Sequence, residues 1–506
     1  MSQHDVIVVG AGNGGLCAAT TCAQAGYKVL LLEKHNLPGG CATSFVRGRF
    51  EFEPSLHELC DESTNPRMRS MKQIYADLGI DTKFLREEML YRVICKGPNG
   101  YDHRIRAGKE GFLDSMEEAC PGSRGLLNTM FELNYLFDAA QIYMDDCGGV
   151  SGMNPITLIT KYGDFIRAAG NSTDKFLDAL GMDDKTKSLT NTYWGYLGDP
   201  PRDLNAMHFI SLLAAYVEGK PSMPYDRSHG MSLAAVKALQ NYGGEVWYNS
   251  EVTEFLYDEE GAAIGVVANG EAIYSQKIIS NVIPNNVLNL SDNKFVKKSM
   301  RKLANARKLG MSIITVYLGL DCTMEELGVD DYSVFVVKDP DANVQYDQRK
   351  DMGLYIVNCL NKTIPDASPE GTCMLFFTIP SFDGDFPENL KPQDYKKYKN
   401  ALAEKYIRDY EELLGIDIMS HIEEISVATP VTFARYLSTP NGTIYGYMSQ
   451  SWDNVINRTV FKDLENKVKN MRFCGGHSLR GDGYPSGFIT GEMMAKEIIA
   501  ELKEGK

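Results

Sequence analysis

The sequence has few tryptophans and no pattern of paired cysteines. Three of its 506 residues are Trp and eleven are Cys, and the cysteines form neither a C-x-x-C pair nor a repeated spacing. An odd, scattered set of cysteines is typical of reduced thiols in a cytosolic protein and argues against a disulfide framework or a structural zinc site. We therefore expect a cytoplasmic protein that holds no metal.

An excess of positive charge is also missing. The chain has 52 Lys and Arg against 67 Asp and Glu, which gives a formal net charge of -15. Binding to nucleic acid, or to an anionic membrane surface as the main partner, depends on clustered basic side chains. We expect no nucleic-acid partner, although the composition is compatible with local basic patches.

Long apolar runs are absent too. The longest apolar helical stretch, residues 207–217, is well short of the roughly 20 residues that a membrane-spanning helix needs. At the N-terminus, Asp5 and the glycines after it interrupt any signal-peptide pattern, so none is expected. We expect a protein without a membrane span, compatible with peripheral membrane attachment.

The first feature that the sequence does have is a complete β-α-β pattern, near the N-terminus. Residues 6–9 (VIVV) are a continuous apolar run typical of a strand buried on both faces, and residues 10–15 (GAGNGG) follow as G-x-G-x-x-G. Residues 16–25 predict a helix of small residues that Gly26 ends. Residues 28–33 (KVLLLE) predict a second buried strand that ends in an acid.

Each part of this pattern suits a dinucleotide. Gly10 permits a tight turn, Gly12 lets the backbone approach a pyrophosphate, and Gly15 lets helix and strand pack closely. The helix N-terminus offers free N–H groups to phosphates. Glu33 lies where an acid accepts hydrogen bonds from a ribose diol, and its charge disfavours the 2'-phosphate of NADP. This pattern alone suits NAD as well as FAD.

A second glycine pair distinguishes the two cofactors. Gly39 and Gly40 stand in the stretch LPGGCATSF (residues 37–45), directly after the second strand. A plain NAD domain has no need for this pair. Here the sequence resembles the glutathione-reductase-like flavoproteins that include phytoene desaturases, carotenoid isomerases and retinol saturases, with amine oxidases as more distant relatives. An Arg often follows the pair in these families, whereas this chain has Cys41, which is closer to the isomerase and saturase branch.

Three later stretches strengthen the resemblance. Residues 243–281 predict short strands and a hairpin after a helix over 231–242. Residues 471–489 predict a strand, a glycine segment and a helix that starts near 486 and runs to about 502. By resemblance, this helix directs its N-terminus at the flavin pyrimidine edge, where its dipole stabilises reduced flavin by about 0.3 to 1 kcal/mol. Residues 428–446 resemble a stretch that leads from the substrate domain back toward the flavin.

The resemblance implies an α/β fold: a glutathione-reductase-like, FAD-binding Rossmann domain with an interleaved α+β substrate domain. The FAD domain would comprise residues 1–65, 222–285 and 465–506, and the substrate domain residues 66–221 and 286–464. In the substrate domain the pattern predicts helices over 112–119, 126–143, 207–216 and 392–414, and strands over 312–318, 355–359 and 374–379. We expect 66–221 to be mostly helical and the sheet of 286–464 to carry helices on one side.

The resemblance also implies the site residues. The cofactor is FAD, and the residues expected to bind it are Gly10, Gly12, Asn13, Gly14, Gly15, Glu33, Lys34, Gly39, Gly40, Cys41, Thr43, Val252, Asn281, Gly476, Asp482, Gly487, Phe488 and Ile489. Arg435, Tyr445 and His57 are the candidate catalytic residues, each of which could instead have only a packing role. The eight His residues include no H-E-x-x-H motif, and no catalytic triad is visible.

The leading hypothesis is a flavoenzyme that desaturates, saturates or isomerises carbon–carbon bonds of a small apolar substrate, by resemblance a polyene or retinoid. It would exchange electrons with an unidentified donor or acceptor. One alternative is an amine oxidase acting on C–N bonds, in which Trp452 or Tyr445 forms part of an aromatic cage. Another is a non-enzymatic escort of prenylated proteins with the same fold, which the intact Glu33 and glycine segments disfavour. The sequence leaves the oligomeric state and the direction of reaction open.

Overall fold

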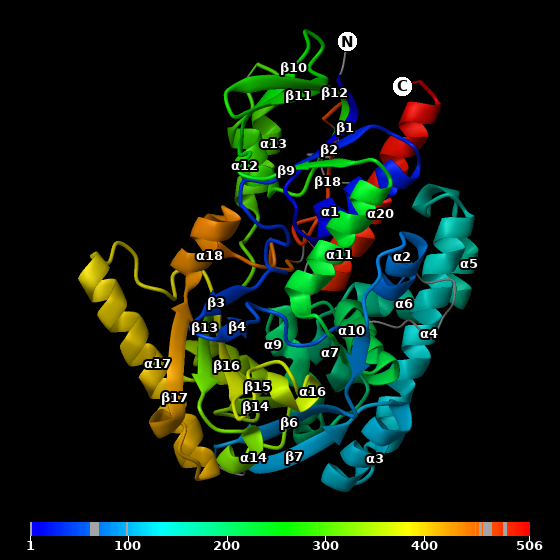
Figure 1. Cartoon of the computed structure of the whole chain (residues 1–506). Helices are drawn as coiled ribbons and strands as arrows, with labels where there is room; N and C mark the ends of the chain where they lie inside the picture. Colours follow the sequence, from blue (N-terminus) through cyan, green and yellow to red (C-terminus); the bar gives the residue numbers. More distant parts are fainter. Residues whose placement is uncertain are drawn as a thin grey trace.

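Two seven-stranded sheets, one above the other in Figure 1, form the framework of the molecule. The computed structural model describes residues 3–60, 70–97, 100–292, 294–450, 452–454, 458, 468–478 and 483–505. Within this part of the chain every helix is too short or too polar to cross a bilayer. The fold is α/β, as the sequence predicts.

The first sheet has the strand order β10-β11-β12-β1-β2-β9, and β18 pairs with β12. Its strands are β1 (His4–Val9), β2 (Val29–Leu32), β9 (Glu245–Trp247), β10 (Val252–Tyr257), β11 (Ala263–Ala268), β12 (Glu271–Ser280) and β18 (Met471–Phe473). The pairs β1–β2, β1–β12, β2–β9 and β12–β18 are parallel. Segments from both ends and the middle of the chain therefore share one sheet. The precise domain boundaries stay a prediction.

Both faces of the first sheet are covered, which explains the continuous apolar strands. Alternate residues Val6 and Val8 pack toward α1 (Asn13–Gln24), α11 (Arg227–Asn241) and α20 (Gly483–Lys503). Ile7 and Val9 belong to the core on the other face, under β10 to β12, α12 (Pro284–Asn289) and α13 (Lys298–Ala306). A parallel strand buried on both sides needs apolar residues at every position.

The second sheet has the order β17-β13-β16-β15-β14-β6-β7. Its strands are β6 (Met89–Cys95), β7 (Tyr101–Arg106), β13 (Ser312–Leu320), β14 (Ser333–Val337), β15 (Leu354–Cys359), β16 (Cys373–Ser381) and β17 (Ile422–Ala428). The chain also forms two short antiparallel pairs, a hairpin of β3 (Phe45–Arg47) with β4 (Phe50–Phe52), and a long-range pair of β5 (Phe84–Arg86) with β8 (Ser222–Pro224). The predicted strands over 312–318, 355–359 and 374–379 are confirmed.

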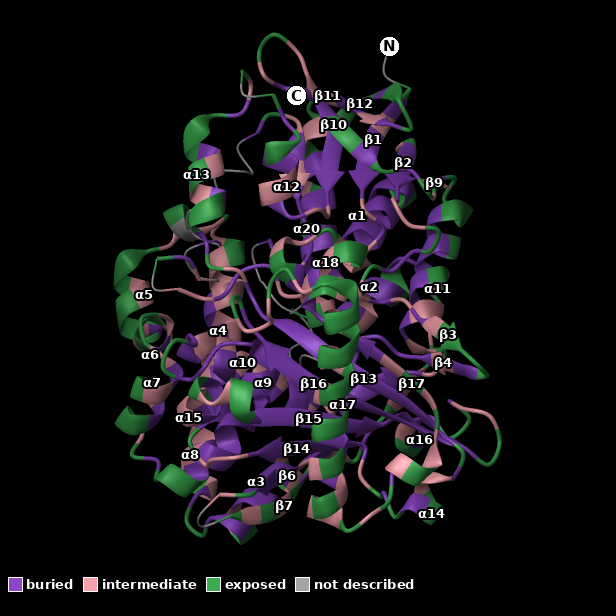
Figure 2. Cartoon of the chain, turned by 90° about the vertical axis from the view of Figure 1, so that its left-hand side faces the viewer, coloured by how far each residue is buried: buried purple, intermediate pink, exposed green. Residues whose placement is uncertain are grey.

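Side chains alternate between two cores across this sheet. Val316 and Leu318 pack with α17 (Pro392–Leu414), which lies along the sheet in Figures 1 and 2 with an exposed outer side. Ile313 and Tyr317 face the opposite way, toward the core that includes α9 (Trp194–Leu197) and α10 (Ala206–Gly219). The expectation of helices on one side only is therefore wrong, because both faces carry apolar residues that helices bury.

The segment between residues 66 and 221 is largely helical. It contains α2 (Met71–Asp77), α3 (Lys109–Ala119), α4 (Arg124–Asp146), α5 (Pro155–Lys161), α6 (Gly163–Ala169), α7 (Thr173–Ala179) and α8 (Asp184–Thr190), as well as α9 and α10. The same segment nevertheless contributes β6 and β7, and β6 pairs in parallel with β14. This long-range pairing joins the helical segment to the second sheet.

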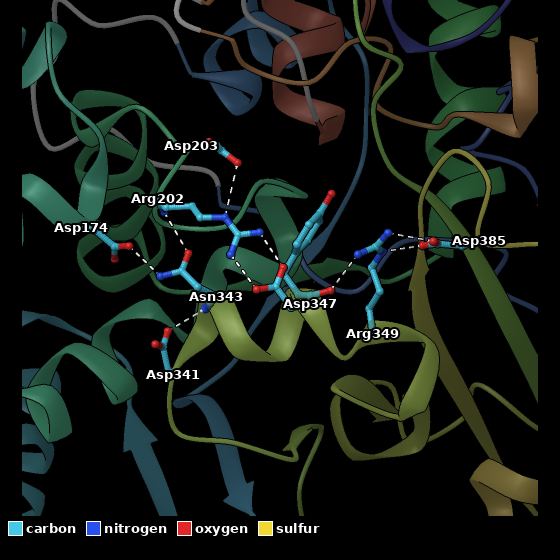
Figure 3. A network of polar contacts seen from close by, with 9 residues as sticks. Asp174, Arg202, Asp203, Asp341, Asn343, Asp347, Arg349 and Asp385 are labelled. Carbon is cyan, nitrogen blue, oxygen red and sulfur yellow. Dashed lines mark hydrogen bonds and ion pairs between the residues drawn. The ribbon is translucent and has the colours of Figure 1, made fainter.

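A network of charged side chains links the helical segment to α15 (Ala342–Asp347) (Figure 3). Arg202 donates to both carboxylate oxygens of Asp347, at 2.9 and 2.7 Å, and Asn343 donates to Asp174 at 2.6 Å. These side chains are partly exposed, and each exposed ion pair contributes about 1 kcal/mol or less. We infer that the network fixes the orientation of α15 more than it adds stability.

Candidate active site

The carboxyl ends of four parallel strands meet at one edge of the first sheet. β1 is followed by Gly10, β2 by Glu33, β12 by Asn281, and β18 by Cys474 and Gly475. In open parallel sheets this edge is where nucleotides bind. The topology therefore brings the motif residues from three distant segments of sequence together.

A cradle of glycines lies at this edge. A Cβ atom on Gly12 would come within 2.6 Å of the Asn281 amide nitrogen, and one on Gly14 within 2.9 Å of the Gly475 backbone nitrogen. Gly12 caps α1 without a side-chain hydrogen bond. The first N–H groups of α1 are therefore available to an anion, which is the requirement of a pyrophosphate site.

The second glycine pair lies beside the first. Gly39 donates its N–H to the Ala11 carbonyl at 2.8 Å and forms a parallel bridge with Gly12. Gly39 has φ +116°, and a Cβ there would come within 2.0 Å of the Ala42 carbonyl oxygen. Glycine is therefore required for this turn, which places residue 41 against the same space as the first motif.

The N-terminus of α20 points at this space as well. A Cβ on Gly487 would lie 3.2 Å from the Asn13 Cβ, and one on Gly491 would lie 2.3 Å from the Gly14 carbonyl oxygen. The hydroxyl of Tyr484, on the first turn of α20, donates to the Cys41 carbonyl at 2.8 Å. Two helix N-termini thus converge on one site.

Glu33 is held in place by backbone donors. Its Oε2 accepts from the Ala11 N–H at 2.7 Å, and its Oε1 accepts from the His35 N–H at 2.8 Å. The residue is buried yet borders the cavity described next. A carboxylate fixed in this way can still accept from a hydroxyl pair through its remaining lone pairs.

One cavity of about 630 Å³ runs from this edge into the second half of the molecule. Its size is within the range of small-molecule sites. Of the residues predicted to bind the cofactor, those that line it are Gly10, Gly12, Asn13, Gly14, Glu33, Lys34, Gly39, Gly40, Cys41, Val252, Asn281, Gly476 and Gly487. The glycine cradle and Glu33 therefore open into the same space.

Some predicted binding residues do not line the cavity. Gly15 packs against the Gly10 carbonyl, Phe488 and Ile489 are buried in the core beside α1, and Thr43 is not on the cavity wall. Gly15, Phe488 and Ile489 therefore support the site through packing, and the Thr43 hydroxyl is buried without a hydrogen-bond partner. Asp482 lies outside the described residues.

Two of the three candidate catalytic residues lie on the cavity wall and the third does not. His57 and Tyr445 line the cavity. Arg435 does not line it: its side chain is exposed on α18 (Pro430–Leu437), and its carbonyl accepts a hydrogen bond from Lys34. Of the three candidates, Arg435 is therefore the one that lies off the cavity wall, and its catalytic role stays a prediction.

Beyond the glycines the cavity wall combines apolar and aromatic residues with a few polar ones, among them His208 and Ser211. Tyr196 and Tyr216 line it together with Leu212 and Ala215 of α10. The His57 ring lies 5.3 Å from the Tyr196 ring, centroid to centroid. Burial lowers the pKa of His57 to about 4, so its imidazole is neutral at pH 7. We call this part of the cavity the aromatic chamber.

The sequence did not reveal the carboxyl group in this chamber. Glu58 is buried on the cavity wall, next to His57. A glutamate in a loop is ordinarily exposed, and its tyrosine neighbours come from residues far along the chain. The apolar residues on either side of the pair, Leu56 and Leu59, were the available signal.

The buried carboxyl groups give the stability of the protein a pH dependence. Burial raises the pKa of Glu53 to about 7 and that of Glu58 to about 8, from an ordinary value of 4.5. As pH rises above 4.5 the unfolded chain loses these protons while the folded state keeps them, so the free energy of unfolding falls. Burial lowers the pKa of His57 and His477 to about 4 and 3, which has the opposite sign but acts below about pH 7.

We therefore expect the free energy of unfolding to fall between pH 7 and 8. The slope is about 1.4 kcal/mol per pH unit for each carboxyl group that is still protonated in the folded state. Urea unfolding at several pH values measures it, and Glu58→Gln is expected to flatten the decline. A midpoint that stays constant or rises over this interval would contradict the assigned protonation.

Comparison with known proteins agrees with this geometry. Residues 8–75 match the model of an NAD(P)-binding Rossmann-like domain. Among solved structures, an oxidoreductase from Methanosarcina mazei has a TM-score of 0.66 at 14% identity, covering 97% of this chain and 100% of that one. A putrescine oxidase has a TM-score of 0.62 at 16% identity, covering 98% and 99%. The fold is therefore the glutathione-reductase-like one, a Rossmann domain with an interleaved α+β domain.

Among curated proteins, the chain is similar to enzymes named for retinoids and carotenoids. The chain is 24% identical to all-trans-retinol 13,14-reductase of Macaca fascicularis, over 87% of this chain and 77% of the relative. It is 24% identical to chloroplastic prolycopene isomerase of Daucus carota, over 99% and 80%. It is 25% identical to 4,4'-diapolycopene oxygenase of a Methylomonas species, over 99% and 100%. Over most of its length the chain is therefore similar to members of the phytoene desaturase, carotenoid isomerase and retinol saturase-like family, and it is an oxidoreductase.

Proposed function

We propose that this protein is an FAD-dependent oxidoreductase that acts on carbon–carbon single or double bonds of an apolar, polyene or retinoid-like substrate. The observation that carries the proposal is the single cavity that joins the glycine cradle to the aromatic chamber. A dinucleotide at the cradle and an apolar molecule in the chamber would then share one enclosed space. The similarity to retinol reductases and prolycopene isomerases supports the substrate class.

The residues present fit FAD. The uncapped N-terminus of α1 would receive the pyrophosphate, and the Gly39–Gly40 turn leaves room for an extended chain beside it. Burial raises the pKa of Cys41 to about 12, so this residue, at the position where an Arg often follows the glycine pair in the resembled families, presents a neutral thiol. When bound, FAD supplies a ring that takes up or returns a hydride. The chain itself positions the substrate and excludes water.

Glu33→Ala is expected to weaken FAD binding by about 1.5 to 3 kcal/mol, because a hydrogen bond to a charged group is lost. This corresponds to about 10- to 150-fold in Kd, which titration of the flavin-free protein with FAD measures. Glu33→Gln retains one acceptor oxygen and serves as the matched control, with a smaller loss. Equal affinity in all three proteins would mean that the ribose is held elsewhere.

The function is tested with the purified protein under anaerobic conditions. Released cofactor is identified by chromatography, and the protein with reduced FAD is then mixed with all-trans-retinol or prolycopene while flavin absorbance and the products are followed. We expect reoxidation of the flavin or a new isomer with a polyene. A flavin that responds to none of the polyenes but is reduced by amines would overturn the proposal.

Amine oxidation is the second candidate because three tyrosines, Tyr196, Tyr216 and Tyr445, line the cavity and could enclose an amine. The fold similarity to putrescine oxidase is compatible with it. Trp452 cannot contribute, since it is 45% exposed and away from the cavity wall.

The third reading from the sequence is a non-enzymatic escort of prenylated proteins. A protein that purifies without flavin would favour this reading over both enzymes.

A further inference from the structure

Glu58 is a buried acid that has no basic partner among the described residues. It is 4% exposed and lines the cavity. The Tyr193 hydroxyl donates to its Oε1 at 3.2 Å, whereas its Oε2 is buried and has no hydrogen-bond partner. Among the residues that the structure describes, no Lys or Arg forms an ion pair with it. An unpaired carboxylate at such a position is costly, so the neutral acid is favoured.

The surroundings of Glu58 keep it protonated. The titratable groups near its carboxyl are the phenols of Tyr91, Tyr193, Tyr196, Tyr216 and Tyr332 and the carboxyl of Glu87, and the Tyr216 hydroxyl donates to the Glu58 backbone carbonyl at 3.2 Å. Burial raises the pKa of Glu58 to about 8 and, together with the nearby Glu58 carboxyl, raises that of Glu87. Two neighbouring carboxyl groups in an apolar site cannot both ionise near neutrality.

We propose that Glu58 is the proton donor of the reaction, giving its carboxyl hydrogen to a carbon of the substrate in the aromatic chamber. The inference rests on the proposed function and adds to it a named acid. It favours reduction or acid-assisted isomerisation over desaturation, because a neutral acid delivers a proton where a desaturase must remove one.

The step balances for reduction of a double bond. One carbon receives the hydride that reduced FAD supplies, and the other receives the proton from Glu58, so one π bond is replaced by two C–H bonds. Flavin is oxidised by two electrons and the substrate is reduced by two. Glu58 remains as a carboxylate until it regains a proton from Glu87 or solvent, and an external two-electron donor reduces the flavin again.

The other buried groups near this position are less suitable donors. His57 is neutral at pH 7 and carries no additional proton to give. Glu53 is also buried, but its oxygens accept backbone N–H bonds from Leu56 at 3.3 Å and Ser228 at 3.0 Å, and it does not line the cavity. Glu53 therefore offers a matched control on the same segment.

The first test compares Glu58→Gln with Glu53→Gln. Both proteins are loaded with FAD, reduced anaerobically, and mixed with all-trans-retinol or prolycopene, whichever the wild type converts. We expect Glu58→Gln to lose about 10²- to 10⁴-fold in the rate of conversion, as for removal of a general acid, with substrate affinity retained. Glu53→Gln is expected to keep the wild-type rate. The wild-type rate should fall above about pH 8, and the residual Glu58→Gln rate should not.

The second test reads Glu58 directly and does not depend on turnover. Infrared difference spectra, wild type minus Glu58→Gln at pH 7 in the FAD-loaded protein, are expected to show the carbonyl stretch of a neutral carboxylic acid that shifts in D₂O. A carboxylate signal at this position would overturn the proposal, and so would a Glu58→Gln rate equal to the wild type. If the wild type converts no polyene, the proposed function fails, and the infrared result still decides whether Glu58 is an acid.

Discussion

A Gly12→Val protein is expected to fold normally and to retain no flavin. The backbone φ of Gly12 is -74°, which valine adopts without strain. The atom that the new Cβ would meet is the end of the Asn281 side chain, which can move aside. The branched side chain would then occupy the space over the N-terminus of α1 that a pyrophosphate needs.

The measurement is the ratio of flavin to protein after purification, together with circular dichroism and thermal unfolding. Gly125→Val is the matched control, because a Cβ at Gly125 in α4 meets no atom within 4 Å. The control should carry the wild-type amount of flavin. A well-folded Gly12→Val protein with normal flavin content would place the dinucleotide somewhere else.

Gly15→Ala is expected to damage the fold itself. A Cβ on Gly15 would lie 1.9 Å from the Gly10 carbonyl oxygen and 3.1 Å from its carbon, which are backbone atoms at the junction of β1 and α1. Neither can shift without separating the helix from the sheet. We expect a loss of about 4 kcal/mol or more in the free energy of unfolding, a large share of the 5 to 15 kcal/mol that is usual for a domain.

Urea unfolding, or soluble yield if the loss is larger, measures this effect. Gly125→Ala serves as the control and should leave the unfolding midpoint unchanged or slightly raised. If Gly15→Ala unfolds at the wild-type midpoint, the close approach of helix and strand does not exist. The two substitutions, three residues apart, thus separate cofactor binding from folding.

The local elements of the first sheet could be predicted from the sequence because their signals are local. Residues 6–9 lie in β1, β2 spans 29–32 of the predicted 28–33, and the glycines between the two strands lie at the turn that the motif requires. Helix α17, Pro392–Leu414, has the predicted bounds because Pro begins it and Gly415 follows it with φ +67°.

The missed strands depend on distant partners. β7 has the sequence YDHRIR, which is too polar to suggest a buried strand, and it joins the sheet through β6. β6 in turn pairs with β14, more than 200 residues later in the chain. The local sequence pattern cannot indicate a pairing over this distance, so the sequence predicts residues 66–221 to be mostly helical and misses these strands.

The candidate site divides in the same way. The glycine cradle could be predicted from the sequence, because the glycines and Glu33 are needed for local backbone geometry and stand at a fixed spacing. The acid Glu58 could not be predicted in this way, because its protonation depends on tyrosines from residues 193–216 and on Glu87, which are distant in the sequence. Arg435 is predicted from a motif-like stretch, and its exposed position on α18, away from the cavity wall, could not be read from that stretch.

The first sheet and its glycine cradle draw on residues from 10 to 487. During synthesis, the α1 turn leaves the ribosome long before β18 and α20 exist, so the nascent chain cannot enclose a nucleotide. Any ligand that contacts all of these elements can therefore be enclosed only after nearly the whole chain has been made, and the early β-α-β unit has an incomplete binding face for most of translation.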